Sequence, residues 1–427
     1  MLASMMQPNL EGLNGLSGVR GDALARWQDS GWPGLRAEAW RFTSLNAVQK
    51  MDLRPAGTTS AGTASAGNAN VSAVTPALAD NLPENAVILS IHNGVLDNTG
   101  LANLPAGITY SLLDDADNAD QDALANIAVL APKDHPVSNL SLAAMTSGLH
   151  LDIQGIVEIP VIFVFTGDDN SASTHPVISI RLANNAAAIF GEVHHSSVGL
   201  AAPLTVIDVG AKARLDYAKI QQESALSTHL AATGLRLSEG SVFDGFQISV
   251  GGKLSRLETH VTLTGENADC TLSAIYLGRD KQHHDITTNM NHEKGHCVSS
   301  QIIRGVLDDA ARGVFQGKVY VAPNAQKTDG NQMSRALLLS RKAEADAKPE
   351  LEIYADDVLC AHGATVGELD DAQLFYLTSR GIKPEIARAM LISAFLDDAI
   401  NGIGNDQLAA MLRPVANAWM AAHSGDM

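Results

Sequence analysis

Residues 241–277 read SVFDGFQISV-GGK-LSRLETHVTL-TGENAD-CTLSAIYL, and this stretch decides the fold class. Three runs rich in Val, Ile, Leu and Thr lie at 241–250, 254–263 and 270–277, and the corners between them carry Gly, Asn or Asp. Apolar β-branched residues favour strands, whereas Gly, Asn and Asp favour turns. Because no segment between the runs is long enough for a helix, the stretch predicts consecutive β-strands.

The same texture extends from about residue 156 to about residue 362, and we assign the β core to 156–366. Strand-like runs recur about every 10–14 residues, which is typical of an all-β fold. A region of this length exceeds one ordinary β-sandwich. A stack of parallel coils absorbs it easily, because each coil adds only about 4.8 Å along the axis. A β-solenoid is therefore the preferred architecture, and two sandwiches are the alternative that strand spacing leaves open.

Residues 1–155 form a mixed, largely helical region in this interpretation. Apolar residues at helical spacing indicate helices within 21–28 and 120–131, and a short strand is expected at 86–91. Residues near 54–83 consist mostly of Ala, Gly, Ser, Thr and Asn, which bury too little apolar surface to order a segment. We therefore expect a flexible linker there.

Residues 367–427 return to a helical pattern and form the predicted C-terminal domain. Three helices are predicted, over Asp370–Arg380, Pro384–Ile400 and Asp406–Ala422. Pro384 suits the first position of a helix, where its missing N–H has no intrahelical partner. Pro414 is expected to kink or divide the third helix.

Composition narrows the class of partner and the compartment. A formal net charge of -18 argues against nucleic acid or an anionic membrane surface as the main partner. Three widely separated cysteines make no disulfide framework and indicate a reducing compartment. The first residues lack the basic and long apolar regions of a signal peptide, and no apolar run approaches the length of a membrane span. We expect a cytoplasmic protein.

Residues 356–367 read DDVLCAHGATVG and hold the first candidate site. A short strand is predicted at 358–362, so Cys360 and His362 share one face, about 7 Å apart. A thiol and an imidazole together suit iron, zinc or copper(I). Two ligands do not complete a metal site, so on residue types alone a buried Cys and a half-exposed His at a strand end is the favoured interpretation.

A second cluster invites a metal interpretation. Four histidines and a cysteine lie within fifteen residues: His283, His284, His292, His296 and Cys297. Their spacing fits no closed zinc pattern, so a structural role is favoured. A β-solenoid metalloenzyme that uses the four histidines stays as an alternative. There is no P-loop, no Gly-x-Gly-x-x-Gly after a strand and no Gly-x-Ser-x-Gly, so no ATPase, dinucleotide-binding or hydrolase motif is present.

Five stretches carry a further pattern: 36–45 (RAEAWRFTSL), 292–307 (HEKGHCVSSQIIRGVL), 313–321 (GVFQGKVYV), 325–340 (AQKTDGNQMSRALLLS) and 349–367 (PELEIYADDVLCAHGATVG). Together they resemble the SufB/SufD family of iron–sulfur cluster assembly subunits. SufB subunits carry Cys-x-His-Glu-Ala where this chain has Cys-x-His-Gly-Ala. Gly363 therefore favours the SufD branch of the family.

The resemblance implies a right-handed parallel β-helix core flanked by helical N-terminal and C-terminal regions. It implies a non-catalytic scaffold subunit that pairs with SufB through the last β-helix coils and docks the SufC ATPase through the C-terminal helices. A nascent iron–sulfur cluster is expected at the junction with SufB. The resemblance gives His362 as its ligand, with Cys360 as a second candidate.

The resemblance also bears on what the isolated chain holds. No cofactor is expected to be tightly bound to it, although reduced flavin is associated with the complex in this family. A homodimer of the isolated chain is a further option. A purely structural stabiliser of SufB, which would tolerate the loss of both Cys360 and His362, is the third interpretation of function.

Overall fold

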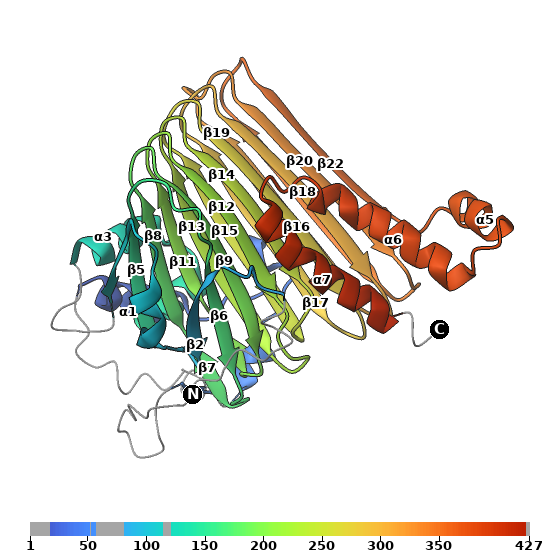
Figure 1. The fold of residues 1–427 in the computed structure, drawn as a ribbon, viewed down its shortest axis with the longest axis horizontal. Coiled ribbons are helices and arrows are strands. Elements are labelled where there is room, and N and C mark those ends of the chain that lie inside the picture. The colour runs from blue at the N-terminus through green and yellow to red at the C-terminus, as the bar shows by residue number, and fades with distance from the viewer. Residues whose placement is uncertain (1–17, 52, 57–80, 114–120, 424–427) are drawn as a thin grey trace.

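The computed structural model describes residues 18–51, 53–56, 81–113 and 121–423. Within these residues the chain alternates between two parallel β-sheets and carries helices toward both ends (Figure 1). Successive strands of the core belong to opposite sheets, so the chain winds as a solenoid. The predicted parallel β-helix with helical ends is confirmed. Two sandwiches are excluded, because such sandwiches are built from antiparallel sheets.

The two sheets run the length of the solenoid. The first sheet contains β21 (Glu344–Ile353), β19 (Arg312–Val321), β17 (His283–His292), β15 (Leu254–Leu263), β13 (Thr228–Leu237), β11 (Leu204–Val209), β8 (Pro176–Leu182), β5 (Ser147–Ile153) and β4 (Ile108–Leu112), with β1 (Arg54–Pro55), β7 (Ala172–Thr174) and β10 (Leu200–Ala201) beside this path. The second sheet contains β22 (Leu359–Gly367), β20 (Asp329–Leu338), β18 (Val298–Leu307), β16 (Asp269–Gly278), β14 (Val242–Ser249), β12 (Arg214–Gln221), β9 (Ala187–Ser196), β6 (Val161–Gly167), β2 (Val87–His92) and β3 (Val95–Leu96). Among the described strands, only the pairs β2–β3 and β4–β5 are antiparallel, and β3 and β4 lie at the end of the stack nearer the N-terminus.

Strict register stacks the side chains of successive coils in columns. Leu215, Phe243 and Cys270 are paired in register on β12, β14 and β16, and all three are buried in the core between the sheets. Each square ångström of apolar surface removed from water contributes about 25 cal/mol. Each coil therefore adds apolar burial that stabilises the solenoid. A polar residue inside such an apolar column needs hydrogen-bond or ionic partners in the core.

The corners between strands rely on the left-handed backbone conformation. Asn185, Asn267 and Asp309 have φ values of 61°, 60° and 50°. Asn and Asp adopt this conformation more readily than most residues, because their short polar side chains bond locally. The Gly, Asn and Asp corners predicted from the sequence thus mark the turns of the solenoid.

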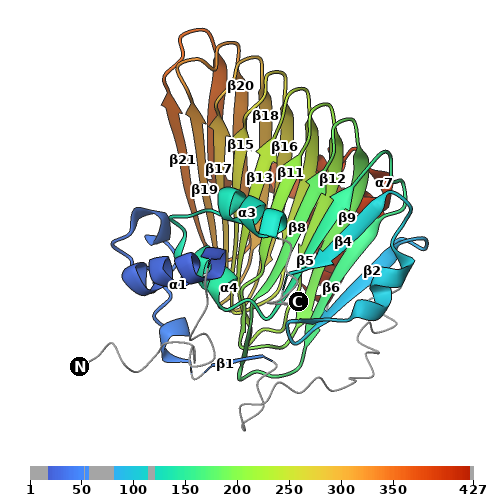
Figure 2. The same cartoon turned by 90° about the vertical axis from the view of Figure 1, so that its left-hand side faces the viewer.

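The N-terminal elements cover the outer face of the first sheet (Figure 2). They are α1 (Gly18–Ser30), α3 (Gln121–Leu130), α4 (Pro136–Ala143) and the short 3-10 helices η2 (Glu38–Trp40) and η3 (Val48–Lys50), while η4 (Asn98–Asn103) lies beside β2. The expected helices and the strand near 86–91 are present. The linker predicted near 54–83 lies almost wholly outside the described residues. Strands β2 and β5 precede residue 156 and already belong to the two sheets, and the three-part domain division stays a prediction.

Two C-terminal helices pack on the outer face of the second sheet (Figure 1). The three helices are α5 (Asp371–Ser379), α6 (Pro384–Ile400) and α7 (Asp406–His423). Ile392 and Leu396 of α6 and Leu412 of α7 are buried in one cluster with residues of the sheet. Pro414 lies inside α7, which continues through it, so of the two predicted effects division is absent and a kink stays a prediction. No helix in the described part of the chain combines the length and the apolar character that a membrane crossing requires.

Candidate functional site

The last coil of the solenoid carries the predicted site residues on an edge strand. Within the described residues, β22 has β20 on one side and no strand on the other. Cys360 pairs in register with Gly330, and His362 pairs with Gln332. Because residues in register on parallel strands face the same side, both site residues continue the inward-facing column of β20, where Gly330 and Gln332 are buried. They face the interior, but no further coil of the described chain covers them.

Cys360 is half-buried at this open end. It packs against the apolar core between the sheets, and a methyl group on Gly330 would come within 3.3 Å of its Sγ. Burial raises the pKa of the Cys360 thiol, and the nearby Asp329 carboxylate acts in the same direction, while a hydrogen bond from the Gly330 backbone opposes both. Cys360 is therefore a protonated thiol at neutral pH.

His362 is exposed on the same strand. The residue next to it in the column, Gln332, is 2% exposed, and neither its Nε2 nor its Oε1 has a hydrogen-bond partner among the described residues. Buried amide groups normally form hydrogen bonds, so Nε2 and Oε1 of Gln332 are available to bind a partner at the open end. Gly363 faces the opposite way, toward Met333. The alternation of side chains along the strand placed Cys360 and His362 on one face, but nothing in the sequence indicated that Gln332 lies next to His362 in the same column.

The histidine cluster predicted at 283–296 is not assembled in space. His283 faces the outer side of the first sheet, where its Nε2 lies 3.0 Å from Oγ1 of Thr43, whereas His284 is buried with its Nδ1 2.8 Å from Oγ of Ser249. His292 lies at the other end of the same strand, about 26 Å from His284 at the usual rise of an extended chain. His296 is exposed in a corner with φ 60°, before β18. These four residues cannot bind one ion together.

The outer face of the first sheet holds a buried ionic network that the sequence did not reveal. Arg256 donates to Glu258 at 2.6 Å and to Asp285 at 2.6 Å. Trp40 lies over the guanidinium, 4.1 Å from ring centroid to Cζ, and Thr43 donates to Asp285. Burial alone would raise the pKa of Glu258, but Arg256 and His135 outweigh it and hold that pKa well below its usual range. Residues 36–45 thus cover and hydrogen-bond this buried ionic network, so their role is structural.

A second polar network fills the interior of the middle coils. The buried Glu192 accepts from Tyr217 and from Thr205 at 2.7 Å, and pairs with Lys219 at 3.2 Å. In the sequence these polar residues alternate with apolar ones, as they do on a half-exposed strand. The alternation does not indicate that both faces of these strands are buried.

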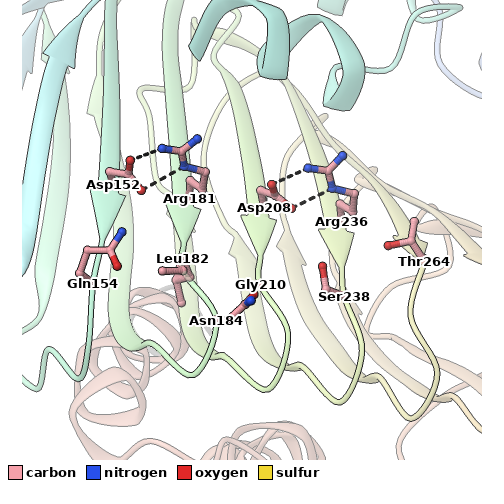
Figure 3. A pocket seen from close by; sticks show the side chains of 11 residues that line it. Asp152, Gln154, Arg181, Leu182, Asn184, Asp208, Gly210, Arg236, Ser238 and Thr264 are labelled. Carbon is pink, nitrogen blue, oxygen red and sulfur yellow. Dashed lines mark hydrogen bonds and ion pairs between the residues drawn. The ribbon is translucent and has the colours of Figure 1, made fainter. Parts of the chain in front are cut away.

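A groove on the outer face of the first sheet has a volume of about 640 Å³. Its walls are two Asp–Arg pairs, Asp152 with Arg181 and Asp208 with Arg236, arranged as a ladder across four strands (Figure 3). The Nε–Oδ1 distance of the second pair is 2.8 Å. Because both guanidinium groups are already paired, this ladder is a surface feature of the sheet and presents no free charge to a ligand.

Comparison with known proteins gives one consistent result. Residues 163–395, more than half of the chain, match the family described as "SUF system FeS cluster assembly, SufBD core domain". The chain is 40% identical to the iron–sulfur cluster assembly protein SufD of Escherichia coli over 202 residues, 47% of this chain and 48% of that protein. It is 30% identical to a SufBD family protein of Synechocystis over 406 residues, 89% of this chain and 86% of that protein. It is 28% identical to SufD of Bacillus subtilis over 63% of each chain.

The matched region spans β6 to α6 and so takes in the middle and last coils, the open edge strand and the first of the packed C-terminal helices. The Synechocystis relative extends the similarity over most of both proteins. The chain belongs to the SufBD family.

Proposed function

We propose that the chain is a non-catalytic scaffold subunit of iron–sulfur cluster assembly. It pairs with a SufB partner through its last coil, binds a nascent cluster at that junction, and docks the SufC ATPase through its C-terminal helices. Family membership supports the link to cluster assembly. It also fits the absence of a P-loop from the sequence, since ATP hydrolysis then belongs to the partner.

The observation that carries the proposal is the open last coil. An unpaired edge strand is a ready template for a strand of another chain. Here the edge is β22, and it places His362 in solvent next to the half-buried thiol of Cys360. A partner strand laid against β22 encloses both side chains in a seam between two proteins.

The donor set suits a cluster that must be handed on. Iron–sulfur clusters tolerate imidazole in place of thiolate, and a site with few ligands holds its cluster weakly. Because the Cys360 thiol is protonated at neutral pH, His362 is the ready ligand and Cys360 needs activation by iron. Opening and closing of the seam by a nucleotide-driven partner then controls access to both.

The test is His362→Ala in the chain co-produced with its SufB and SufC partners. We expect the complex to assemble normally on size-exclusion chromatography, and the anaerobically purified complex to lose its iron, sulfide and visible absorption. The control is His195→Ala, which removes another exposed histidine, from strand β9. Normal cluster content in the His362→Ala complex would overturn the ligand role. If His362→Ala and Cys360→Ala together also left cluster content normal, the chain would be only a stabiliser of SufB.

A further inference from the structure

Three buried side chains meet inside the solenoid, far along the sequence from the proposed cluster site. His194 comes from the end of β9, Glu223 from the corner after β12, and His229 from the start of β13. One ligand atom of each lies within 4.8 Å of the other two. Their relative exposures are 1%, 4% and 0%. Parallel winding brings them together, because Gln221, two residues before Glu223, pairs in register with His194.

The side chains of this cluster contact one another in the interior. Nδ1 of His229 lies 3.0 Å from Oε2 of Glu223. The rings of His194 and His229 are 4.7 Å apart at 71°. Nδ1 of His229 has Glu223 as its contact, but Nε2 makes no hydrogen bond within the described residues, although the side chain is fully buried. Leaving a buried polar group unpaired costs about 1–3 kcal/mol, so a bound partner is expected.

Surrounding groups orient the three side chains. Oε2 of Glu192 lies 2.9 Å from Nε2 of His194, which leaves Nδ1 as the nitrogen to bind an ion. Oγ of Ser196 donates to Oε1 of Glu223 at 3.0 Å. The ring of Phe165 stacks on His194 at 4.1 Å. A carboxylate behind a histidine and a hydroxyl behind a carboxylate are the usual supports of metal ligands, and an apolar wall excludes water.

The charges in this part of the interior do not balance without a cation. Glu192 pairs with Lys219 at 3.2 Å. Glu223 has no such partner, since in the described part of the chain no lysine or arginine lies within ion-pair distance of it, and His229 is its one ion-pair neighbour. Glu223 accepts hydrogen bonds from Ser196 at 3.0 Å and Gln221 at 3.3 Å, but neither side chain supplies a positive charge. A buried carboxylate without a counter-charge is costly, so either a metal ion or a protonated His229 must accompany it.

We propose that His194, Glu223 and His229 bind one divalent first-row metal ion, zinc or iron(II), as a permanent part of the fold. Two histidines and one carboxylate are a donor set of both metals. Two ligand atoms about 2.1 Å from one ion lie roughly 3.0–3.4 Å apart, which matches the His229–Glu223 separation. The site departs from the expectation that the isolated chain holds no tight cofactor. It is independent of the exposed His362.

The experiment uses the full chain without partners. The chain is unfolded in denaturant with a chelator, then refolded with Zn²⁺, with Fe²⁺ under anaerobic conditions, or with chelator alone, and excess metal is removed. We expect about one ion per chain by elemental analysis and a higher melting temperature than for the chelator sample. Because the site is fully buried, metal added after refolding should enter far more slowly than metal present during refolding.

Matched variants separate this site from other histidines. Glu223→Gln and His229→Gln keep the side chains polar and close in size, and should reduce bound metal at least tenfold. His284→Gln alters another fully buried interior histidine outside the cluster and should keep about one ion per chain. Equal metal content in Glu223→Gln, His229→Gln and the unmodified chain would overturn the proposal.

A measurement on the unmodified chain covers the case of variants that do not fold. Refolding with Co²⁺ should give the visible absorption of a cobalt ion with protein ligands, displaced by Zn²⁺. If the folded chain contains no metal by either method, the Glu223 charge is balanced by a protonated His229 and the metal site does not exist.

Discussion

At the scale of single residues, the Cys360 thiol is predicted to be a poor nucleophile until a partner or iron changes its surroundings. Burial and Asp329 raise the thiol pKa. The thiolate fraction therefore becomes appreciable only at a higher pH than in a short cysteine peptide. Alkylation by iodoacetamide, followed by mass spectrometry across pH 7–10, should show slower modification of Cys360 than of the peptide at each pH. The other two cysteines are fully buried and should stay unmodified in the native chain.

The control for that measurement is Asp329→Asn. It removes the neighbouring negative charge and should move the alkylation profile of Cys360 toward lower pH. A Cys360 profile at or below that of the peptide would show that the thiol is activated in the isolated chain, and would make it the stronger ligand candidate of the two.

The two-residue period of a strand determines which site residues could be predicted from the sequence. That period was enough to place Cys360 and His362 on one face. It gave no means of knowing that this face is the inner one, or that it is left open. It also missed the His194–Glu223–His229 cluster, because His194 lies one coil before the other two residues and meets them only through the register of the sheet.

At the scale of elements, α5 and the first half of α6 present exposed apolar side chains that no other described element covers, although Arg380 lies over the ring of Tyr376. Four of its side chains are strongly exposed: Phe375 (73%), Tyr376 (55%), Ile386 (53%) and Met390 (48%). A cluster of exposed apolar residues on helices marks a protein-binding surface. Phe375→Lys with Met390→Lys should weaken binding of the SufC partner by about 30-fold or more, the size of a hot-spot loss, as measured by titration calorimetry.

The matched control is Leu226→Lys, which charges an equally exposed leucine in the corner between β12 and β13. It should leave SufC binding unchanged. Binding that survives the double change on α5 and α6 would mean that SufC uses a different surface.

Helix α6 was predicted with its full bounds, because Pro384 and its apolar stripe are local signals. The continuity of α7 through Pro414 was not predictable, because packing on the second sheet stabilises it.

At the scale of the whole molecule, buried neutral histidines make stability depend on pH. Burial lowers the pKa of three histidines outside the proposed metal cluster: His175 to about 4, His284 to about 3 and His292 to about 4. Between pH 6.5 and about 4 the unfolded chain binds protons at these sites and the folded chain does not. Stability should therefore fall as the pH drops through that range, by up to about 1.4 kcal/mol per pH unit for each histidine.

Urea unfolding at several pH values between 7 and 4.5 checks this expectation. His284→Gln should make the decline less steep by about 1.4 kcal/mol per pH unit, since one of the proton-binding sites of the unfolded chain is gone. An unchanged slope in that variant would show that His284 is already protonated in the folded chain.

The overall architecture was predictable because each coil repeats the same pattern of strand and corner residues along the sequence. A single coil is ambiguous between a solenoid and a sandwich, and only the accumulated length favoured the solenoid. The N-terminal covering was harder, because Trp40 and Thr43 meet their partners Arg256 and Asp285 across more than two hundred residues of sequence. Contacts of that kind leave no periodic trace.

The two ends of the stack differ, and this difference limits what the protein can build. Among the described strands, the short antiparallel β3 and β4 form the edges at the beginning, whereas the final coil ends in the longer edge strands β21 and β22. An object that is adhesive at one terminus alone cannot polymerise head to tail. If the proposed pairing uses the long edges of the last coil, two subunits joined there leave only short edge strands among the described residues, and short edges are poor templates for a further subunit. On the proposed function, this unequal length of the edge strands would restrict a stackable fold to pairs of subunits.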